Sequence, residues 1–485
     1  MSNIKAKSVN AAIWSAIDKF SEQGIRFILG LIVARILFPS DYGLIGMIAV
    51  FIALPDVLVN SGFGAALIQK KNADETDFST VFYFNIIVGI LLYLVLYLIA
   101  PLVATFFNEP ELTLLIRILG LTPIINSFGL IQQTVLTKRL DFKTQTKISV
   151  GSMIPSGIIG ILFAYYGFGV WAIVFQLLSR RLLTTLLLWV FNSWRPQRIF
   201  NIQSLKSLFA FGSNLLIAGI IHTIFSRIYS IVIGKFYHAE ALGYYTRANQ
   251  FVTVPSAGVT TVLERIAFPI FSTLQNNNKL LLAGYRKTVK LAAFVNFPMM
   301  LGLFIVSEPL IILVLTEKWL PAVPYLQLLS IAGLLTPMHT LSLSVIKAKG
   351  DSGNFLKLDI IKKIVSITVL IVIYRWGITA IIYGSIALSA LFFYMNFYYA
   401  GKRMGFSFGR QLLDLFPYAG IASIMAVVMY ISVYFLPDSN ILKLFVPAVL
   451  GFVIYFLLSK LFKVEAYIEF VSVLANLKAR IKKRI

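Results

Sequence analysis

Three ionisable residues interrupt an apolar stretch near the start of the chain. Asp18, Glu22 and Arg26 stand four residues apart within residues 12–37, so in a helix they share one face. A charge at the centre of a bilayer costs about 2.5–3.5 kcal/mol on insertion scales, which makes a lipid-facing stripe of three unfavourable. We expect the stripe to line a wet cavity. An ion-pair ladder confined to this one helix is the alternative interpretation.

Other polar and charged residues also lie within apolar segments. An arginine guanidinium binds phosphate oxygens bidentately and stays charged, and neighbouring carboxylates can carry a coupling proton or cation. A cavity with both kinds of group suits an anionic, sugar-bearing head group. Because Glu264 and Arg265 are adjacent, only one of them need point inward. The candidate cavity residues are Asp18, Glu22, Arg26, Asp56, Asn60, Arg117, His222, Arg227, Arg247, Asn249, Glu264 and Arg265.

The composition identifies the class of protein that must position these residues. Of 485 residues, 58% are hydrophobic and only 13% are charged, and the mean hydropathy is +0.84. Apolar stretches of about 20 residues, the length that crosses a bilayer, recur from end to end. The sequence therefore predicts an all-α polytopic membrane protein. It contains no cysteine, which excludes disulfides and thiolate chemistry.

Turn signals divide the chain into about fourteen predicted transmembrane helices. Proline lies inside several of them, including Pro123 and Pro337, which we expect to bend their helices. The predicted ranges are 9–37, 41–68, 78–106, 111–136, 146–166, 168–192, 204–236, 240–272, 287–306, 321–346, 355–375, 377–400, 411–435 and 441–459.

The formal net charge of +23 predicts an orientation. If the amino terminus is cytoplasmic, lysine and arginine gather in the cytoplasmic connections and acidic residues in the opposite ones, as the positive-inside rule requires. Both termini are then cytoplasmic. The last residues, 463–485, are expected to form a basic amphipathic helix on the membrane surface, with a disordered basic tail as the alternative. Because the basic residues lie in short loops between spans, nucleic-acid binding is not expected.

Weak self-similarity indicates an internal repeat. The order of the matches along the chain, rather than any one of them, predicts two parallel six-helix lobes followed by two further helices. The matched pairs are Gly43 with Gly243 and Pro55 with Pro255, the "LTP" of 121–123 with that of 335–337, Asp141 with Asp351, and Gly167 with Gly377.

The predicted domains follow from this repeat. They are an N-terminal six-helix lobe over 1–198, a C-terminal six-helix lobe over 199–401, two transmembrane helices over 402–462, and the basic tail over 463–485. Two pseudo-symmetric lobes suit alternating access, in which they rock about a central site.

The sequence lacks the signatures of an enzyme. It shows no G-x-x-x-x-G-K-[ST] phosphate loop, no metal-ligand spacing and no nucleophile elbow. We predict no catalytic activity, no metal and no cofactor, and leave open a coupling proton or sodium ion. An ion gradient, the membrane potential or the substrate's own gradient must then supply the energy.

Several stretches resemble a known family. "ILFPSDYGLIGMIAVF", "LVNSGFGAALIQKKNADETDFSTVFYFNI", "APLVATFFNEPEL" and "YYGFGVWAIVFQ" are similar to the Wzx-type polysaccharide and O-antigen flippases, in particular the colanic-acid and teichuronic-acid exporter branch. These belong to the superfamily (MOP) that includes the multidrug extruders (MATE) and the lipid II flippase MurJ. The quoted stretches are mostly turns and packing segments, so they fix no binding residue.

The resemblance implies a fold and a function. The fold is a MATE/MurJ-like bundle of two lobes and fourteen helices. The function is transfer of an undecaprenyl-pyrophosphate-linked oligosaccharide from the cytoplasmic to the outer leaflet of a bacterial inner membrane. Expected partners are that polyprenyl-pyrophosphate-linked oligosaccharide, membrane lipids, and a glycan polymerase with its export machinery.

Two other functions remain alternatives from the sequence. One is cation-coupled multidrug efflux of the MATE type, which needs a mainly acidic and aromatic site. The other is a membrane polysaccharide polymerase or ligase, which is expected to carry a sizeable outer loop with acid/base residues. The longest outer connection, near 306–320, is short and mostly apolar.

Overall fold

Helix is the only regular secondary structure in the part of the chain that the structure describes. The computed structural model describes residues 14, 21–60 and 62–471, and Asp18 lies outside them. Eleven helices among these residues are long and apolar enough to cross a membrane. The chain is therefore a multi-pass α-helical membrane protein, as its composition predicts.

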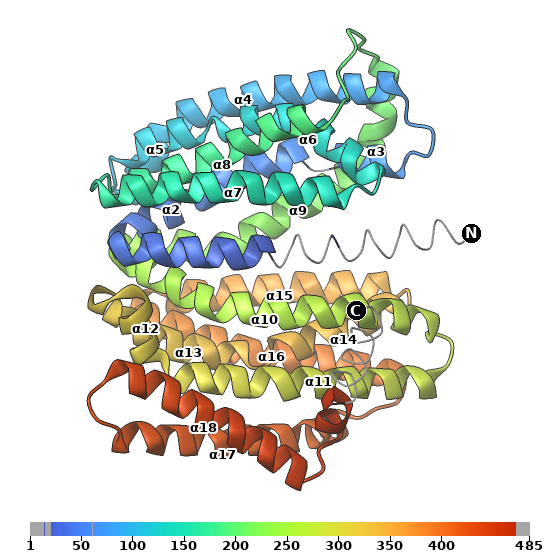
Figure 1. Ribbon diagram of the computed structural model, residues 1–485. Helices are drawn as coiled ribbons and strands as arrows, with labels where there is room; N and C mark the ends of the chain where they lie inside the picture. The colour runs from blue at the N-terminus through green and yellow to red at the C-terminus, as the bar shows by residue number, and fades with distance from the viewer. Residues whose placement is uncertain (1–13, 15–20, 61, 472–485) are drawn as a thin grey trace, which may run out of the picture. The chain divides into compact units, whose positions relative to one another are not determined.

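The contacts of the chain divide into two compact units, residues 1–243 and residues 244–485. The predicted domain boundaries, including the one at residue 198, stay predictions. In the first unit, helical residues 21–36 precede the named helices. These are α2 (Pro39–Asn60), α3 (Phe63–Gln69), α4 (Glu75–Phe107), α5 (Leu112–Leu119), α6 (Thr122–Lys138), α7 (Phe142–Tyr165), α8 (Val170–Phe191) and α9 (Ile202–Phe236) (Figure 1).

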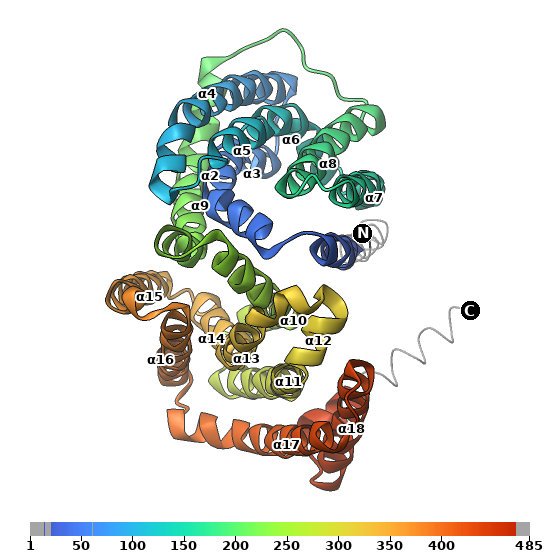
Figure 2. The same ribbon diagram turned by 90° about the vertical axis from the view of Figure 1, so that its left-hand side faces the viewer.

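The second unit contains the remaining helices. Its first helix, α10, begins at Ala239, just before the boundary. The helices are α10 (Ala239–Thr273), α11 (Asn278–Ile305), α12 (Ser307–Leu315), η1 (Glu317–Ala322), α13 (Val323–Gly333), α14 (Thr336–Ala348), α15 (Ser352–Ile373), η2 (Tyr374–Trp376), α16 (Ile378–Met404), α17 (Phe408–Phe435) and α18 (Asn440–Leu461). The last two, α17 and α18, lie side by side in both views (Figure 1, Figure 2).

Three predicted spans each contain a break in the helix, although each is still long and apolar enough to cross a membrane as one span. Gly62, with φ 92°, separates α2 from α3 within the predicted helix 41–68. Pro123 stands at the start of α6, and Pro337 at the start of α14. A proline lacks the N–H that a continuing helix needs but is tolerated in a first turn, so each starts a new segment. The count of fourteen membrane-crossing helices stays a prediction.

The region near 306–320 is also more ordered than expected. Instead of a short connection it forms α12 and the 3₁₀ helix η1. Trp319 of η1 is fully buried, which anchors this segment to the second unit.

Polar side chains tie the segment after α8 back to the core of the first unit. Trp194 packs edge-on against Phe82 of α4, with ring centroids 5.8 Å apart, and its Nε1 donates to Glu75 Oε2 at 2.7 Å. Asn192 donates to the backbone oxygen of Gln132 on α6 at 3.0 Å. These bonds satisfy buried polar groups where the helix ends and fix the end of α8 beside α6.

The core of the second unit joins α11 to α14 and α17. The Tyr285 hydroxyl lies 2.9 Å from Ser342 Oγ and donates to Gln411 Oε1 at 2.9 Å. All three side chains are buried, so each needs a hydrogen-bond partner inside the protein. This network therefore fixes α11, α14 and α17 against one another along their lengths.

The repeat that the sequence suggests is visible in local geometry. Asp141 caps α7 with φ −87° and accepts from the Thr144 N–H, and Asp351 caps α15 with φ −85° and accepts from the Asn354 N–H. Each follows a residue with positive φ, Leu140 at 58° and Gly350 at 71°. The same helix–turn–helix connection therefore occurs in both halves of the chain.

Gly43 and Gly243 form a reciprocal close contact within residues 1–243. A Cβ on Gly43 would lie 1.7 Å from the Ala239 backbone oxygen, and a Cβ on Gly243 would lie 1.8 Å from the Pro39 backbone oxygen. Only glycine leaves room for backbones this close. The match at a shift of 200 residues thus reflects the first turns of two helices, α2 and α10, packed on each other.

The described part of the tail begins with a short helix, residues 465–471. Val464 and Ala466 are buried, and Glu465 and Glu469 pair with Lys290 and Lys287 of α11 at 2.5 and 2.8 Å. The tail therefore starts by docking onto the protein. Residues 472–485 lie outside the described residues, and the predicted membrane-surface helix stays a prediction.

Candidate functional site

Glu22 accepts hydrogen bonds from two arginines in the first unit. One is Arg26, four residues later on the same helix. The other is Arg180 of α8, whose Nη2 lies 2.6 Å from Glu22 Oε1. An ion-pair ladder confined to one helix therefore does not fully describe Glu22. Its carboxylate also joins this helix to α8, through an arginine 158 residues away in the sequence.

Asp56 has a similar environment on α2. Its Oδ2 accepts from Arg181 Nη2 at 2.8 Å, and its other oxygen accepts from the Asn126 amide of α6. The Asp56 side chain is 18% exposed, so its charge needs these partners. Asp56 therefore joins α2 to α6 and α8.

Neighbouring positions on α8 explain why two carboxylates are engaged at once. Successive residues on a helix project about 100° apart. Arg180 therefore reaches the first helix while Arg181 reaches α2. We call Glu22, Arg26, Asp56, Asn126, Arg180 and Arg181 the arginine–carboxylate cluster.

The cluster carries an excess of positive charge. Its three guanidinium groups face two carboxylates. The side chains of Arg26 and Arg181 are 58% and 46% exposed, so N–H donors beyond those bonded to the carboxylates are accessible. Guanidinium donors of this kind bind phosphate oxygens with charge-assisted hydrogen bonds. The cluster can therefore bind an anionic group while its carboxylates limit the affinity.

The other predicted residues of the first unit lie outside this cluster. The Arg117 guanidinium stacks on the Tyr97 ring of α4, 4.2 Å from its centroid. His222 and Arg227 are exposed on α9. Asn60 ends α2, and its side chain is not among those described.

The four predicted residues of the second unit lie along α10. Arg247 is buried and donates to Gln250 Oε1 at 2.6 Å, and Asn249 is half-buried. Glu264 accepts from Ser344 Oγ of α14 at 3.1 Å, whereas Arg265 is exposed. Adjacent Glu264 and Arg265 thus have different surroundings, as their spacing predicts. That these residues share a cavity with the first unit stays a prediction.

The sequence reasoning missed Asn126, Arg180 and Arg181. The two arginines occupy the middle of a 22-residue helix that has no other charged residue. The rule that identifies Glu22, a costly charge inside a span, applies equally to them. Asn126 has no such signal, because a single asparagine in a helix is common.

A second polar group that the sequence reasoning missed lies in the second unit. Lys362 of α15 is 9% exposed and donates to Asn396 Oδ1 at 3.3 Å. The Asn396 amide in turn donates to the backbone oxygen of His339 at 3.2 Å. Lys362 lies near the cytoplasmic connection in the predicted topology, and this group links α14, α15 and α16.

Among the residues that the structure describes, no group of three or more His, Cys, Asp and Glu side chains could hold a metal ion.

Comparison with known proteins identifies the family. A family model described as polysaccharide biosynthesis protein matches residues 32–324, more than half of the chain. The chain belongs to this family. It is 32% identical to the teichuronic acid biosynthesis protein TuaB of Bacillus subtilis (strain 168), over 72% of this chain and 73% of that protein. It is 26% identical to the lipopolysaccharide biosynthesis protein WzxC of Escherichia coli (strain K12), over 76% of each.

The fold also has a solved counterpart. The lipid II flippase MurJ, in an inward closed conformation, matches with a TM-score of 0.76 at 15% identity, covering 93% of this chain and 98% of that one. The resemblance and the MurJ-like fold inferred from the sequence are both confirmed.

Proposed function

We propose that this protein is a flippase for lipid-linked oligosaccharides. It moves an undecaprenyl-pyrophosphate-linked glycan across a bacterial inner membrane by alternating access between two lobes. It has no catalytic activity of its own. Membership of the polysaccharide biosynthesis family supports the glycan, and the MurJ-like fold supports a transporter rather than an enzyme.

The arginine–carboxylate cluster is the observation that carries the proposal. Charges within apolar helices are costly unless they have a function or a partner. Here the partners leave guanidinium donors in excess. A pyrophosphate esterified at both ends, by the polyprenyl chain and by the sugar, is a dianion with several acceptor oxygens, and exposed Arg26 and Arg181 offer it matching donors. The glycan and the polyprenyl chain need no such charge.

The same geometry bears on the alternative of multidrug efflux. A site for cationic drugs needs a carboxylate that is free to bind the cation. Glu22 and Asp56 instead each accept from an arginine, which places a positive charge beside each acid. We therefore favour an anionic substrate. Glu22 and Asp56 remain the best acceptors for a coupling proton or sodium ion in this cluster, because binding there would release an arginine.

The proposed orientation places both termini in the cytoplasm. The basic connections between helices support it through the positive-inside rule. A reporter that is active only in the cytoplasm, fused after Lys143 or after Lys349, should be active at both positions. Silence at either position would refute the orientation without touching the substrate proposal.

The direct test is glycan export by variants of the cluster. We would express Arg180→Gln, Arg181→Gln and the double variant in a strain that makes a lipid-linked glycan but lacks its own exporter. Arg198→Gln, which removes an exposed arginine from the segment after α8, is the matched control.

Surface glycan and membrane abundance of the protein are both measured. We expect the single variants to reduce export per molecule of protein in the membrane by about tenfold or more, the size of a lost charge-assisted hydrogen bond, with the control at wild-type level. Full export by the double variant at normal abundance would remove the cluster from the transport mechanism.

A further inference from the structure

A polar pocket lies at one end of the first unit, apart from the arginine–carboxylate cluster. It has a volume of about 510 Å³ and lies where α6 ends, α7 begins and α8 ends. Its lining includes Arg139, Lys143, Trp14, Phe191 and Ser193. A pocket of this size holds a small-molecule group rather than a single ion.

The two cations of this pocket have no carboxylate partner in the part of the chain that the structure describes. Among the described residues, neither Arg139 nor Lys143 forms an ion pair. Lys143 Nζ lies 5.9 Å from the centroid of the Trp14 ring. Neighbouring Lys138 is different, because its ammonium donates to the backbone oxygens of Leu67 and Lys70 at 3.0 and 2.9 Å. Lys138 thus has a structural role that Arg139 and Lys143 do not share.

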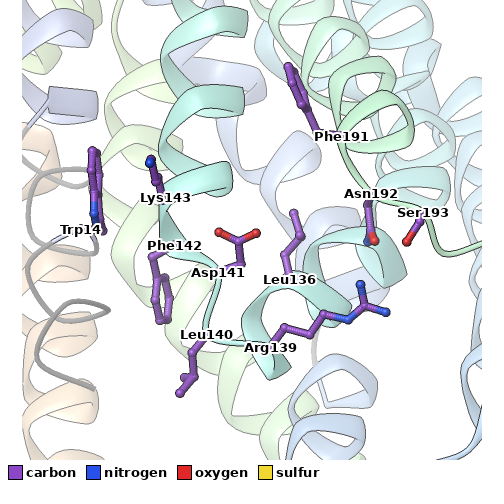
Figure 3. Close-up of a pocket in the computed structure, with 10 residues that line it drawn as sticks. All are labelled: Trp14, Leu136, Arg139, Leu140, Asp141, Phe142, Lys143, Phe191, Asn192 and Ser193. Carbon is purple, nitrogen blue, oxygen red and sulfur yellow. The ribbon is translucent and has the colours of Figure 1, made fainter. Parts of the chain in front are cut away.

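The acidic residue of the pocket is already engaged. Asp141 accepts from the Thr144 backbone N–H at 3.1 Å and from the Thr144 hydroxyl at 2.8 Å. Figure 3 shows the Arg139 side chain extending toward the side where Asn192 and Ser193 lie, with Lys143 and Trp14 on the opposite side. The pocket therefore offers cationic donors from two directions around one locally satisfied carboxylate.

The connection between α14 and α15 is the repeat equivalent of the one between α6 and α7. Its charged side chains have partners within the protein. There Asp351 pairs with Arg403, and Lys349 Nζ donates to Asn278 Oδ1 at 2.6 Å and to the Arg403 backbone oxygen at 2.8 Å. The shift that relates the start of α8, Val170, to the start of α16, Ile378, is 208 residues, which places Arg195 opposite Arg403. Arg195 donates to the backbone oxygens of Asn192, Trp194 and Trp189. The matching arginine of the first half is thus engaged with the backbone, and Asp141 accepts from Thr144 instead.

Exposed apolar side chains lie at the rim of the pocket. Leu140 and Phe191 are 44% and 52% exposed at the ends of membrane-spanning helices. Aromatic and basic side chains together at a helix end are typical of the membrane–water interface. A ligand with both a phosphate and acyl chains would match the exposed cations Arg139 and Lys143 and the apolar side chains beside them.

We propose that this pocket binds the phosphate head group of an anionic glycerophospholipid. The phosphate lies between Arg139 and Lys143, the Ser193 hydroxyl donates to it, and the acyl chains lie along Leu140 and Phe191. The site is separate from the cluster that carries the proposed function, so either can fail alone. A phosphate-binding site specific for soluble anions is the competing possibility that the experiment distinguishes.

The test uses the purified full-length protein in a neutral detergent. Dioleoyl-phosphatidylglycerol, dioleoyl-phosphatidylcholine or inorganic phosphate is added, and bound lipid is counted by native mass spectrometry while thermal unfolding is followed. The variant is Arg139→Gln/Lys143→Gln. The matched control, Arg198→Gln/Lys206→Gln, removes the same charge from exposed residues of the same unit. The charge-conserving variant Arg139→Lys/Lys143→Arg separates charge from packing.

We expect phosphatidylglycerol, but not phosphatidylcholine or phosphate, to bind and raise the unfolding temperature of the wild type. The affinity of the double glutamine variant for phosphatidylglycerol should fall by at least about tenfold, since each cation near a lipid head group contributes to binding. The control and the charge-conserving variant should keep it. Equal binding by the glutamine variant and the control would overturn the site. An equal effect of inorganic phosphate would overturn the lipid assignment.

Discussion

Removing one partner of the Asp56–Arg181 pair should have unequal consequences. Asp56 is 18% exposed and Arg181 is 46% exposed. In Arg181→Gln the buried carboxylate keeps only the Asn126 amide. An incompletely satisfied buried charge costs about 1–3 kcal/mol. In Asp56→Asn the arginine loses its partner but reaches the wet cavity that the proposed function requires, so the loss is that of an exposed pair, about 0–1 kcal/mol.

The expected difference between the two variants is therefore about 1–2 kcal/mol. For a unit of this size, each kcal/mol of lost stability lowers the unfolding temperature by roughly 2–4 °C. We would measure thermal unfolding of the full-length protein in detergent for both single variants and for Asp56→Asn/Arg181→Gln. The double variant should lose less than the two single variants combined, because it leaves no unpaired charge.

The opposite order would refute the reasoning. If Asp56→Asn destabilises the protein more than Arg181→Gln, the exposed end of Arg181 meets hydrocarbon, where an unpaired cation is costly. The cluster would then be a structural ion pair rather than part of a wet site. Additive losses in the double variant would show that the two side chains act independently.

Two further predictions concern the fold. Gly43→Ala should lower the unfolding temperature, because its Cβ would lie 1.7 Å from the Ala239 oxygen and such overpacking costs about 1–3 kcal/mol. Gly24→Ala, with nothing within 4 Å, should be neutral or stabilising, and an equal loss in both would contradict the close contact. Hydrogen bonding by Asn354, with the Arg403 pair, lowers the pKa of Asp351. Its stabilising effect is therefore present above the unfolded pKa of about 3.9 and lost as pH falls through the folded value. Asp351→Asn should flatten the decline of unfolding temperature below about pH 5, and an unchanged decline would show that this turn is not responsible.

Much of the helix assignment could be predicted because apolar length is a property of the sequence itself. A segment such as Glu75–Phe107 is long and apolar enough to cross a bilayer in any fold. Local breaks were harder to place. Pro123 and Pro337 were expected to bend continuous helices, yet each begins a new one. A proline permits either outcome, and the packing of the neighbouring helices decides between them.

The candidate site was predicted in part. Glu22 and Arg26 could be paired from their spacing alone, since residues four apart on a helix are neighbours. Arg180 and Arg181 are more than 120 residues from the carboxylates that they bind. The cost of a charge in an apolar span marks such residues as important, but it does not say which partner each one has.

The sequence by itself determined that this chain is a helical membrane protein of the polysaccharide biosynthesis family, and that an imperfect repeat runs through it. These follow from hydropathy, charge and motif, which do not depend on contacts. Only the tertiary structure decided that α8 supplies the arginines for Glu22 and Asp56. It also decided that Arg403 pairs with Asp351 in one repeated turn, whereas Arg195 binds backbone oxygens beside the other. Hydrogen bonds and ion pairs act over a few ångströms, so helix packing determines which distant residues they join.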